Sequence, residues 1–132
     1  MTPSSRPVAK RRPVYLNLPQ IRQPIPAIAS ILHRISGALL FFVGVPALLW
    51  GVQASLASPE AYEAFRVFMA QPLVKLVGVV LVWAYLHHLF AGLRHLLMDV
   101  HIGLDLKPAR QSATIATVVA LVLTLLVAIR LW

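Results

Sequence analysis

The sequence contains no cysteine and little charge, and both absences narrow the class of protein. Without a thiol, the chain can form no disulfide, no c-type haem attachment and no iron–sulfur cluster held by its own cysteines. Only 12% of its 132 residues are charged and only 4 are acidic, whereas 59% are hydrophobic. This composition is too apolar for a soluble domain of this length and indicates a membrane protein.

Three long segments lack Lys, Arg, Asp and Glu. They are residues 35–58, 76–93 and 111–129, with lengths of 24, 18 and 19 residues. About 20 residues of helix cross a hydrocarbon core of about 30 Å, so the sequence predicts three transmembrane helices and no fourth. We expect an all-α membrane protein with a single membrane-anchor domain over residues 1–132. Its expected parts are a basic cytoplasmic arm (1–26), three transmembrane helices (27–55, 73–100 and 112–132) and a short interfacial helix between the first two.

Local signals refine these helices. After the first span, SPEAYEAFRVFMAQP predicts a short helix at the membrane surface, with Ser58 as N-cap and Pro59 as first residue. Pro46 predicts a bend near the middle of the first span. Small residues that allow close helix packing recur every seven residues in the first span, at Ser30, Gly37, Gly44 and Gly51. A second small-residue stripe, in the third span, consists of Ala113, Thr117, Ala120, Thr124 and Ala128.

The basic residues are distributed unevenly. Of the 12 Lys and Arg residues, nine lie on the N-terminal side, up to Arg34, or around the second loop, and three lie in the first loop or at the C-terminus. The positive-inside rule then places the N-terminus and the second loop in the cytoplasm. We attribute the net charge of +8 to topology and to anionic lipid, and expect no nucleic-acid binding. The first 27 residues show no apolar h-region, so we expect no secretory signal.

Ionisable residues at membrane depth are costly and usually functional. In the first span, SILHRISG carries Ser30, His33 and Arg34 at spacings of three and four, so these side chains share one helical face. That face continues into Gly37. A structural explanation is also open, in which Arg34 reaches lipid phosphates and Ser30 bonds its own backbone.

The second span carries two neighbouring stripes. One consists of His88, Gly92, His95 and Asp99, and the other of His87, Ala91, Arg94 and Met98. A neutral imidazole followed by glycine one turn later suits haem ligation, which favours His88 and makes His87 the weaker candidate. Because His95 lies about 10.5 Å along the same helix, a second axial ligand would have to come from an opposing helix. Histidines that only hydrogen-bond between helices are the alternative.

Two segments carry a resemblance to a known family. RPVYLNLPQIRQPIPAIASILHRIS, residues 12–36, resembles the first signature of the cytochrome b membrane-anchor subunit of succinate dehydrogenase (complex II). HLFAGLRHLLMD, residues 88–99, resembles its second signature. The resemblance covers nearly the whole chain. One departure is His101, where the family pattern leads us to expect a small residue.

The resemblance implies roles for individual residues. His88 would be the axial ligand of haem b from this chain, with the other axial histidine supplied by a second small anchor subunit. His33, Arg34 and His95 would lie near the haem propionates, and Ser30 and Arg34 would line the ubiquinone pocket. The second signature also includes Arg94 and Asp99. We expect these residues to support the helix end and the haem propionates, and not to take part in catalysis.

The resemblance also implies an assembly. A flavoprotein subunit with FAD would oxidise succinate and an iron–sulfur subunit would carry the electrons, so this chain has no succinate site and acts in an enzyme only as a subunit. The expected location is the bacterial inner membrane, multi-pass, with a trimer of heterotetramers as one assembly state. Two alternatives are a fumarate reductase-type anchor with a low-potential quinone and a structural three-helix anchor without cofactor.

Overall fold

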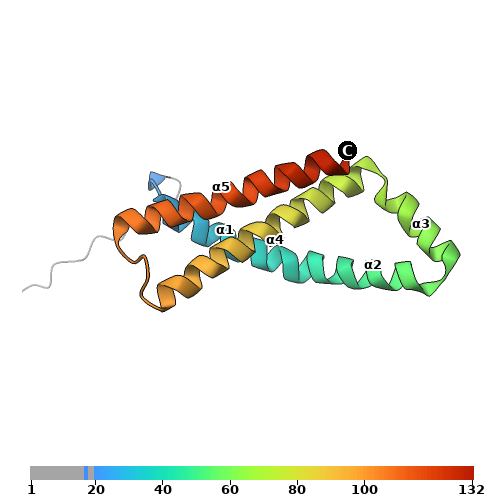
Figure 1. The fold of residues 1–132 in the computed structure, drawn as a ribbon, viewed down its shortest axis with the longest axis horizontal. Coiled ribbons are helices and arrows are strands. Elements are labelled where there is room, and N and C mark those ends of the chain that lie inside the picture. The colour runs from blue at the N-terminus through green and yellow to red at the C-terminus, as the bar shows by residue number, and fades with distance from the viewer. Residues whose placement is uncertain (1–16, 18–19) are drawn as a thin grey trace, which may run out of the picture.

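The computed structural model describes residue 17 and residues 20–132, and this part of the chain is helical without strands. Most of the predicted basic arm, residues 1–16, 18 and 19, lies outside the described residues. Figure 1 shows the order of the elements. They are α1 (Ile25–Leu39), the π-helical η2 (Leu40–Gly44), α2 (Val45–Ala57), α3 (Pro59–Met69), α4 (Pro72–Asp99) and α5 (Leu106–Leu131).

Three helices are long and apolar enough to cross a membrane, which confirms the three predicted spans. They are the continuous α1–η2–α2 helix (Ile25–Ala57), α4 and α5, with 33, 28 and 26 residues. The third helix begins six residues earlier than the expected residue 112, at Leu106. Asp105 precedes it, where a negative charge favours the helix N-terminus, and Pro108 lies in the first turn, where a missing N–H costs nothing. The charged residues Lys107 and Arg110 therefore lie before the uncharged run but still within the helix.

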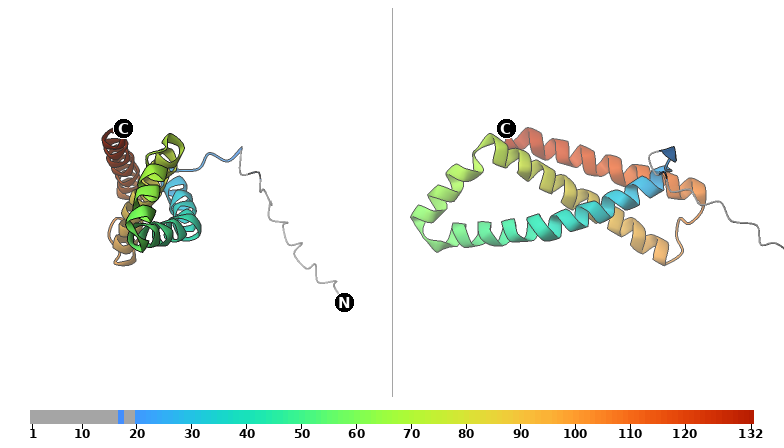
Figure 2. Two further views of the ribbon diagram at one scale, coloured as in Figure 1. Left: turned by 90° about the vertical axis from the view of Figure 1, so that its right-hand side faces the viewer. Right: turned by 180° about the vertical axis from the view of Figure 1, so that it is seen from behind.

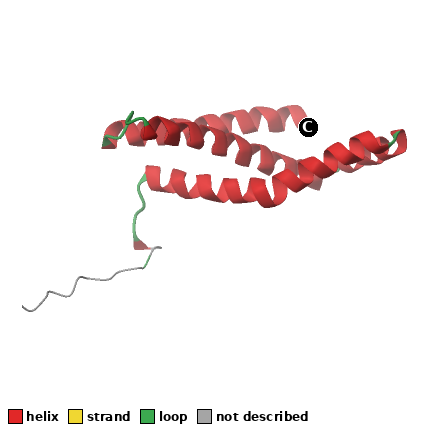
Figure 3. Ribbon diagram, turned by 90° about the horizontal axis from the view of Figure 1, so that it is seen from below, coloured by secondary structure: helices red, strands yellow, loops and turns green. Residues whose placement is uncertain are grey.

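The first span contains a wide turn immediately before Pro46. Within η2 the helix is π-helical, and the N–H of Val45 donates to the carbonyl of Leu40, five residues back. Pro46 has no N–H, and its ring would crowd the carbonyl of Phe42 in a regular α-helix, so a wider turn relieves both problems. Figure 3 shows the first span changing direction along its length. This agrees with the predicted bend.

The wide turn also changes the small-residue stripe of the first span. A Cβ added at Gly37 would meet the His88 ring of α4, whereas one added at Gly51 would lie 3.4 Å from Phe65 of α3. The two glycines therefore face different neighbours. Because a π-turn holds one extra residue, it rotates the faces before and after it relative to each other.

Helix α4 is the centre of the fold and packs against both α1 and α5. Figure 1 and the right-hand view of Figure 2 show α1 crossing α4. The buried apolar side chains of the described residues are all alanines, which let helices approach closely: Ala29, Ala84, Ala91, Ala113, Ala116 and Ala120. The stripe predicted on α5 is confirmed at Ala113, Ala120 and Thr124, which are buried, and Ala116 joins it. Large apolar side chains lie mostly on the outside, as lipid permits.

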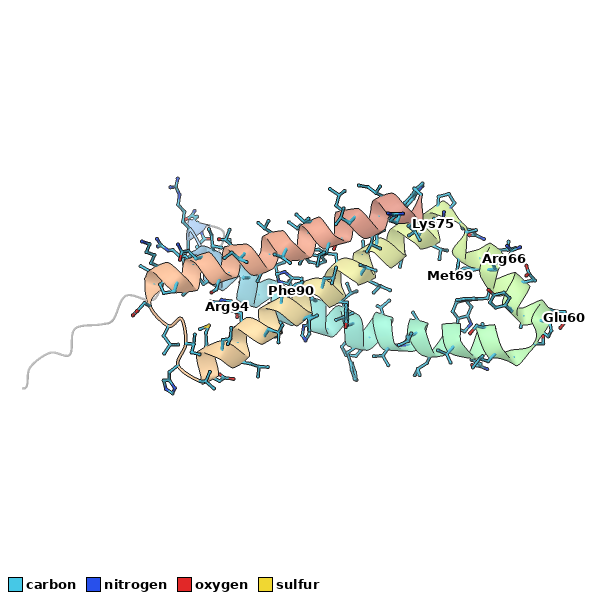
Figure 4. The ribbon with its side chains drawn as sticks, in the orientation of Figure 1. Glu60, Arg66, Met69, Lys75, Phe90 and Arg94 are labelled. Atoms are coloured by element: carbon cyan, nitrogen blue, oxygen red, sulfur yellow. The ribbon has the colours of Figure 1, made fainter. Side chains whose placement is uncertain are left out.

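Two contacts fix the ends of the helices on the side of α3. The hydroxyl of Ser58 accepts a hydrogen bond from the N–H of Ala61 at 3.1 Å, as expected of the N-cap. A hydrogen bond with Ser58 also lowers the pKa of Glu60. Lys75, at the start of α4, donates to the carbonyl of Leu131 at the end of α5, 2.9 Å away (Figure 4). The position of α3 at a membrane surface stays a prediction.

The end of α4 explains the unusual residue 101. The N–H of His101 donates to Met98 and that of Ile102 to Leu97, both at 3.0 Å, which is the pairing of a Schellman cap. This cap puts His101 at φ 64, in the left-handed region. Only glycine takes this conformation freely, and another residue loses roughly 1–2 kcal/mol. The left-handed backbone explains why a small residue is expected at this position. His101 adopts the same conformation, but at a cost in conformational free energy.

Candidate functional site

Three histidines from two helices gather where α1 crosses α4, and we call them the histidine cluster: His33, His88 and His95. The His33 and His88 rings are stacked, with centroids 4.1 Å apart and planes at 12°. The His33 and His95 rings are tilted by 49° with centroids 5.1 Å apart. The fold thus brings together residues that lie more than fifty positions apart in the sequence.

Two glycines let the helices approach at the histidine cluster. A Cβ added at Gly37 would lie only 2.7 Å from Cε1 of His88, closer than van der Waals contact allows. One added at Gly92 would lie 3.5 Å from Nε2 of His33, an ordinary contact. Of these two glycines, Gly37 therefore makes the closer approach. Its place in the small-residue stripe of the first span was the sequence signal for close packing.

A buried hydroxyl and a carbonyl hold one nitrogen of His88. Ser36 is fully buried, and its hydroxyl donates to the carbonyl of His33 at 2.9 Å. Nδ1 of His88 lies 3.0 Å from that carbonyl and 3.3 Å from the Ser36 oxygen. A carbonyl only accepts, so this geometry assigns the hydrogen to Nδ1 and leaves Nε2 with its lone pair. Sequence reasoning gave Ser36 no role, although its spacing of three from His33 places both on one face.

His87 occupies a different environment from its neighbour His88. Its side chain is fully buried, and neither ring nitrogen has a hydrogen-bond partner among the described residues. The ring stacks on Trp83, with centroids 5.5 Å apart and planes at 22°. His88, in contrast, is half-buried. The two histidines therefore differ in exposure, and the choice of His88 as the ligand stays a prediction.

Arg94 joins α4 to the start of α5 instead of facing the histidine cluster. It is 7% exposed, and its Nε donates to the hydroxyl of Ser112 at 3.1 Å. One Nη donates to the carbonyl of Ala109 at 3.5 Å. Figure 4 shows Arg94 on α4. Its contacts match the expected support of a helix end, while Asp99, the last residue of α4, is exposed.

The two other residues of the first polar cluster are open to the surroundings. Ser30 is half-buried and Arg34 is exposed, one helical turn apart in α1. Arg34 makes no hydrogen bond or ion pair with the part of the chain that the structure describes. The guanidinium is therefore available to an anionic group outside this chain, whether lipid phosphate or a ligand.

Comparison with known proteins gives a family for this chain. Residues 8–127 match the family described as succinate dehydrogenase/fumarate reductase transmembrane subunit. The chain belongs to this family. It is 35% identical over 123 residues to the succinate dehydrogenase cytochrome b556 subunit of Coxiella burnetii, which covers 92% of this chain and 98% of that one. It is 38% identical over 119 residues to the subunit of the same name from Paracoccus denitrificans, and this match covers 88% of this chain and 91% of that one.

The subunit from Rickettsia typhi with the same name is 29% identical over 126 residues, which cover 96% of this chain and 98% of that one. The family match covers the first two spans of this chain, most of α5 and the whole histidine cluster. The resemblance that the two signature segments carried is thereby confirmed as membership of the succinate dehydrogenase/fumarate reductase transmembrane family.

Gly37 provides a test of the helix crossing that requires no ligand. Gly37→Ala should destabilise the folded chain by roughly 1–3 kcal/mol, because its Cβ would overlap the ring of His88. The matched control is Gly78→Ala in α4, where an added Cβ meets nothing within 4 Å and helix propensity alone predicts a gain of up to about 1 kcal/mol. Thermal unfolding in detergent, followed by tryptophan fluorescence, measures both. Equal stability of the two variants would contradict the close approach at Gly37.

Proposed function

We propose that this chain is the membrane-anchoring haem b subunit of a succinate:quinone oxidoreductase, and that it helps to bind and reduce ubiquinone. The names of its relatives combine succinate dehydrogenase with a b-type cytochrome, and the family consists of transmembrane subunits. The fold supports the proposal with three apolar helices and a polar cluster between two of them.

The observation that carries the proposal is the state of His88. Histidines that ligate metals usually donate their other ring N–H to a carbonyl or carboxylate, and Nδ1 of His88 has such an acceptor in His33. Nε2 then keeps the lone pair that an iron needs. Within the described residues, no three His, Cys, Asp or Glu side chains could hold a bare metal ion. Haem brings four nitrogens of its own, so a single histidine from this chain is sufficient.

The second axial ligand belongs to a partner in this proposal. His95 lies seven positions from His88 on the same helix, which is about 10.5 Å along its axis. The ring of His33 stacks on that of His88 and does not oppose it across a gap. A histidine from the second small anchor subunit would complete the site. When bound, the haem supplies a one-electron carrier within the membrane.

The remaining residues of the cluster fit the acidic edge of a haem. His33 and His95 approach each other at the same crossing, and Arg34 follows His33 on α1. Hydrogen-bond donors and a fixed cation balance propionate carboxylates. We therefore assign His33, Arg34 and His95 to the propionate region. This assignment agrees with the family resemblance of the two signature segments.

Ser30 and Arg34 are assigned to the quinone. The hydroxyl of Ser30 can donate to a quinone oxygen and reorient as the charge on that oxygen changes. Arg34 is always cationic and stabilises negative charge on the reduced ring, but it is a poor source of protons. Water or a partner side chain would deliver the two protons. Electrons would arrive from the flavoprotein and iron–sulfur subunits, which hold FAD and the clusters.

Two other functions are distinguishable from this one. The family also includes subunits of fumarate reductase, which would work in the opposite direction with a low-potential quinone. A structural anchor without cofactor would use its histidines only between helices. The names of the relatives favour the succinate dehydrogenase function over both alternatives. We also propose a location in the bacterial inner membrane, and the distribution of basic residues supports an N-terminus in the cytoplasm. A trimer of heterotetramers is one assembly state that we propose for the complex.

A difference spectrum tests the proposal directly. The chain should be co-expressed with its three partner subunits, and the purified complex compared in the oxidised and dithionite-reduced states. We expect the narrow α band of a reduced b-type haem, in a ratio of one haem to one copy of this chain. A complex that shows only flavin and cluster absorbance would establish the structural anchor instead. The potential of the haem and the quinone of the membrane separate the succinate and fumarate directions.

A further inference from the structure

We propose that Ser36 is a positioning residue that sets the orientation, hydrogen position and donor strength of the His88 imidazole. The inference rests on the proposed role of His88 as a haem ligand. It adds a residue on the opposite helix that acts through His88 and never touches the haem itself. The contacts of Ser36 carry it.

Ser36 is held rigidly by its own helix. Its hydroxyl donates to the carbonyl of His33, three residues earlier, at 2.9 Å, and its side chain is fully buried. Because the hydroxyl proton is used there, the oxygen presents its lone pairs to Nδ1 of His88 at 3.3 Å. The hydroxyl therefore accepts from His88 and cannot simultaneously donate to it.

The His88 ring is enclosed on several sides by α1. The carbonyl of His33 lies 3.0 Å from Nδ1, and the His33 ring stacks on that of His88. The backbone of Gly37 passes so close that an added Cβ would reach 2.7 Å from Cε1. Of these neighbours, Ser36 is the one side chain that offers Nδ1 a hydrogen-bond acceptor. Two oxygens of α1 thus share one N–H of α4.

This arrangement has an electronic consequence. When two acceptors share the N–H, the other ring nitrogen becomes a stronger electron-pair donor to a metal. Hydrogen bonds of this kind, made to a ligand and not to the metal, tune the reduction potential of bound metals. A ligand that donates its electron pair more strongly favours oxidised iron. Removal of the Ser36 hydroxyl should weaken the donor and widen the range of ring orientations, so the midpoint potential of the haem should rise.

The experiment compares three variants of the four-subunit complex. Ser36→Ala removes the acceptor, and Ser36→Thr keeps a hydroxyl that can still bond a carbonyl in the preceding turn. The control is Ser55→Ala, because Ser55 donates to the carbonyl of Val52 at 3.0 Å in the same way but is only half-buried and lies in α2, far from His88. The measurements are a potentiometric titration of the haem and the low-temperature width of its α band.

We expect Ser36→Ala to raise the potential and broaden the band, Ser36→Thr to restore both toward wild type, and Ser55→Ala to leave both unchanged. If Ser36→Ala prevents haem incorporation, restoration of the wild-type band by threonine supports the inference equally. The inference fails if Ser36→Ala matches wild type in both measurements, or if threonine is no closer to wild type than alanine. The haem content of a His88 variant tests the proposed function separately, so the two failures are distinguishable.

Discussion

A complex that carries His88→Leu is expected to lose its b-type haem spectrum. Leucine fills a similar volume, but it has no nitrogen to ligate iron. The contacts of Nδ1 with His33 and Ser36 leave Nε2 of His88 as the donor that α4 offers at its crossing with α1. Haem quantification by pyridine haemochrome, normalised to the covalently or tightly bound flavin of the same complex, measures the loss.

The neighbouring histidine supplies the matched control. His87→Leu removes a fully buried ring whose nitrogens have no partner among the described residues, so the substitution exchanges an unsatisfied polar group for an apolar one. Such an exchange is close to neutral for stability. The haem spectrum of His87→Leu should therefore be retained. A spectrum that survives in His88→Leu would move the ligand to His87 or His33 and refute the proposed site.

The second large effect is expected for quinone reduction in Arg34→Leu. The loss of a cation that stabilises developing negative charge should lower the rate by roughly 100-fold. Ser30→Ala removes one neutral hydrogen bond, worth about 1 kcal/mol, and should lower the rate of quinone reduction about fivefold. Succinate oxidation at the flavin, measured with an artificial electron acceptor, should remain at the wild-type rate in both variants.

The control for these two variants is Arg110→Leu. Arg110 is an exposed arginine near the start of α5. Figure 1 shows the start of α5 at the same end of the bundle as α1, the helix that carries Arg34. If Arg34 only contacts lipid phosphates, both arginine variants should behave alike and reduce quinone at nearly the normal rate. Equal loss of quinone reduction and of succinate oxidation in Arg34→Leu would show failed assembly. Only a selective loss in Arg34→Leu supports a role at the quinone.

The sequence predicted the helical elements well because their signals are local. Uncharged runs located the three spans, and Ser58 with Pro59 located the start of α3. The start of α5 was wrong by six residues for a physical reason. Charge marks where a helix leaves the hydrocarbon, but a helix continues into water as long as its backbone hydrogen bonds are satisfied. Asp105 and the proline in the first turn were the better signals.

The roles of the site residues stay a prediction, but part of their arrangement followed from the sequence. Helical spacing placed His88 and His87 on different stripes of α4, and in the structure the His88 ring stacks on His33 of α1 while the His87 side chain is fully buried. The contribution of Ser36 was missed, and Gly37 was read only as part of a stripe. Both act through a ring on another helix, and no local pattern in α1 reports which residue of α4 lies opposite.

By itself, the sequence determined how many times the chain crosses the membrane, which faces of its helices are polar and which histidines are candidates, because hydropathy and helical spacing are properties of short segments. The tertiary structure decided the rest, beginning with the height at which α1 meets α4, that is, the position along each helix where the two cross. This position brings the carbonyl of His33 and the hydroxyl of Ser36 within hydrogen-bonding distance of Nδ1 of His88. That height depends on the close packing of glycine and alanine faces and on the wide turn before Pro46, which only the folded chain brings into register.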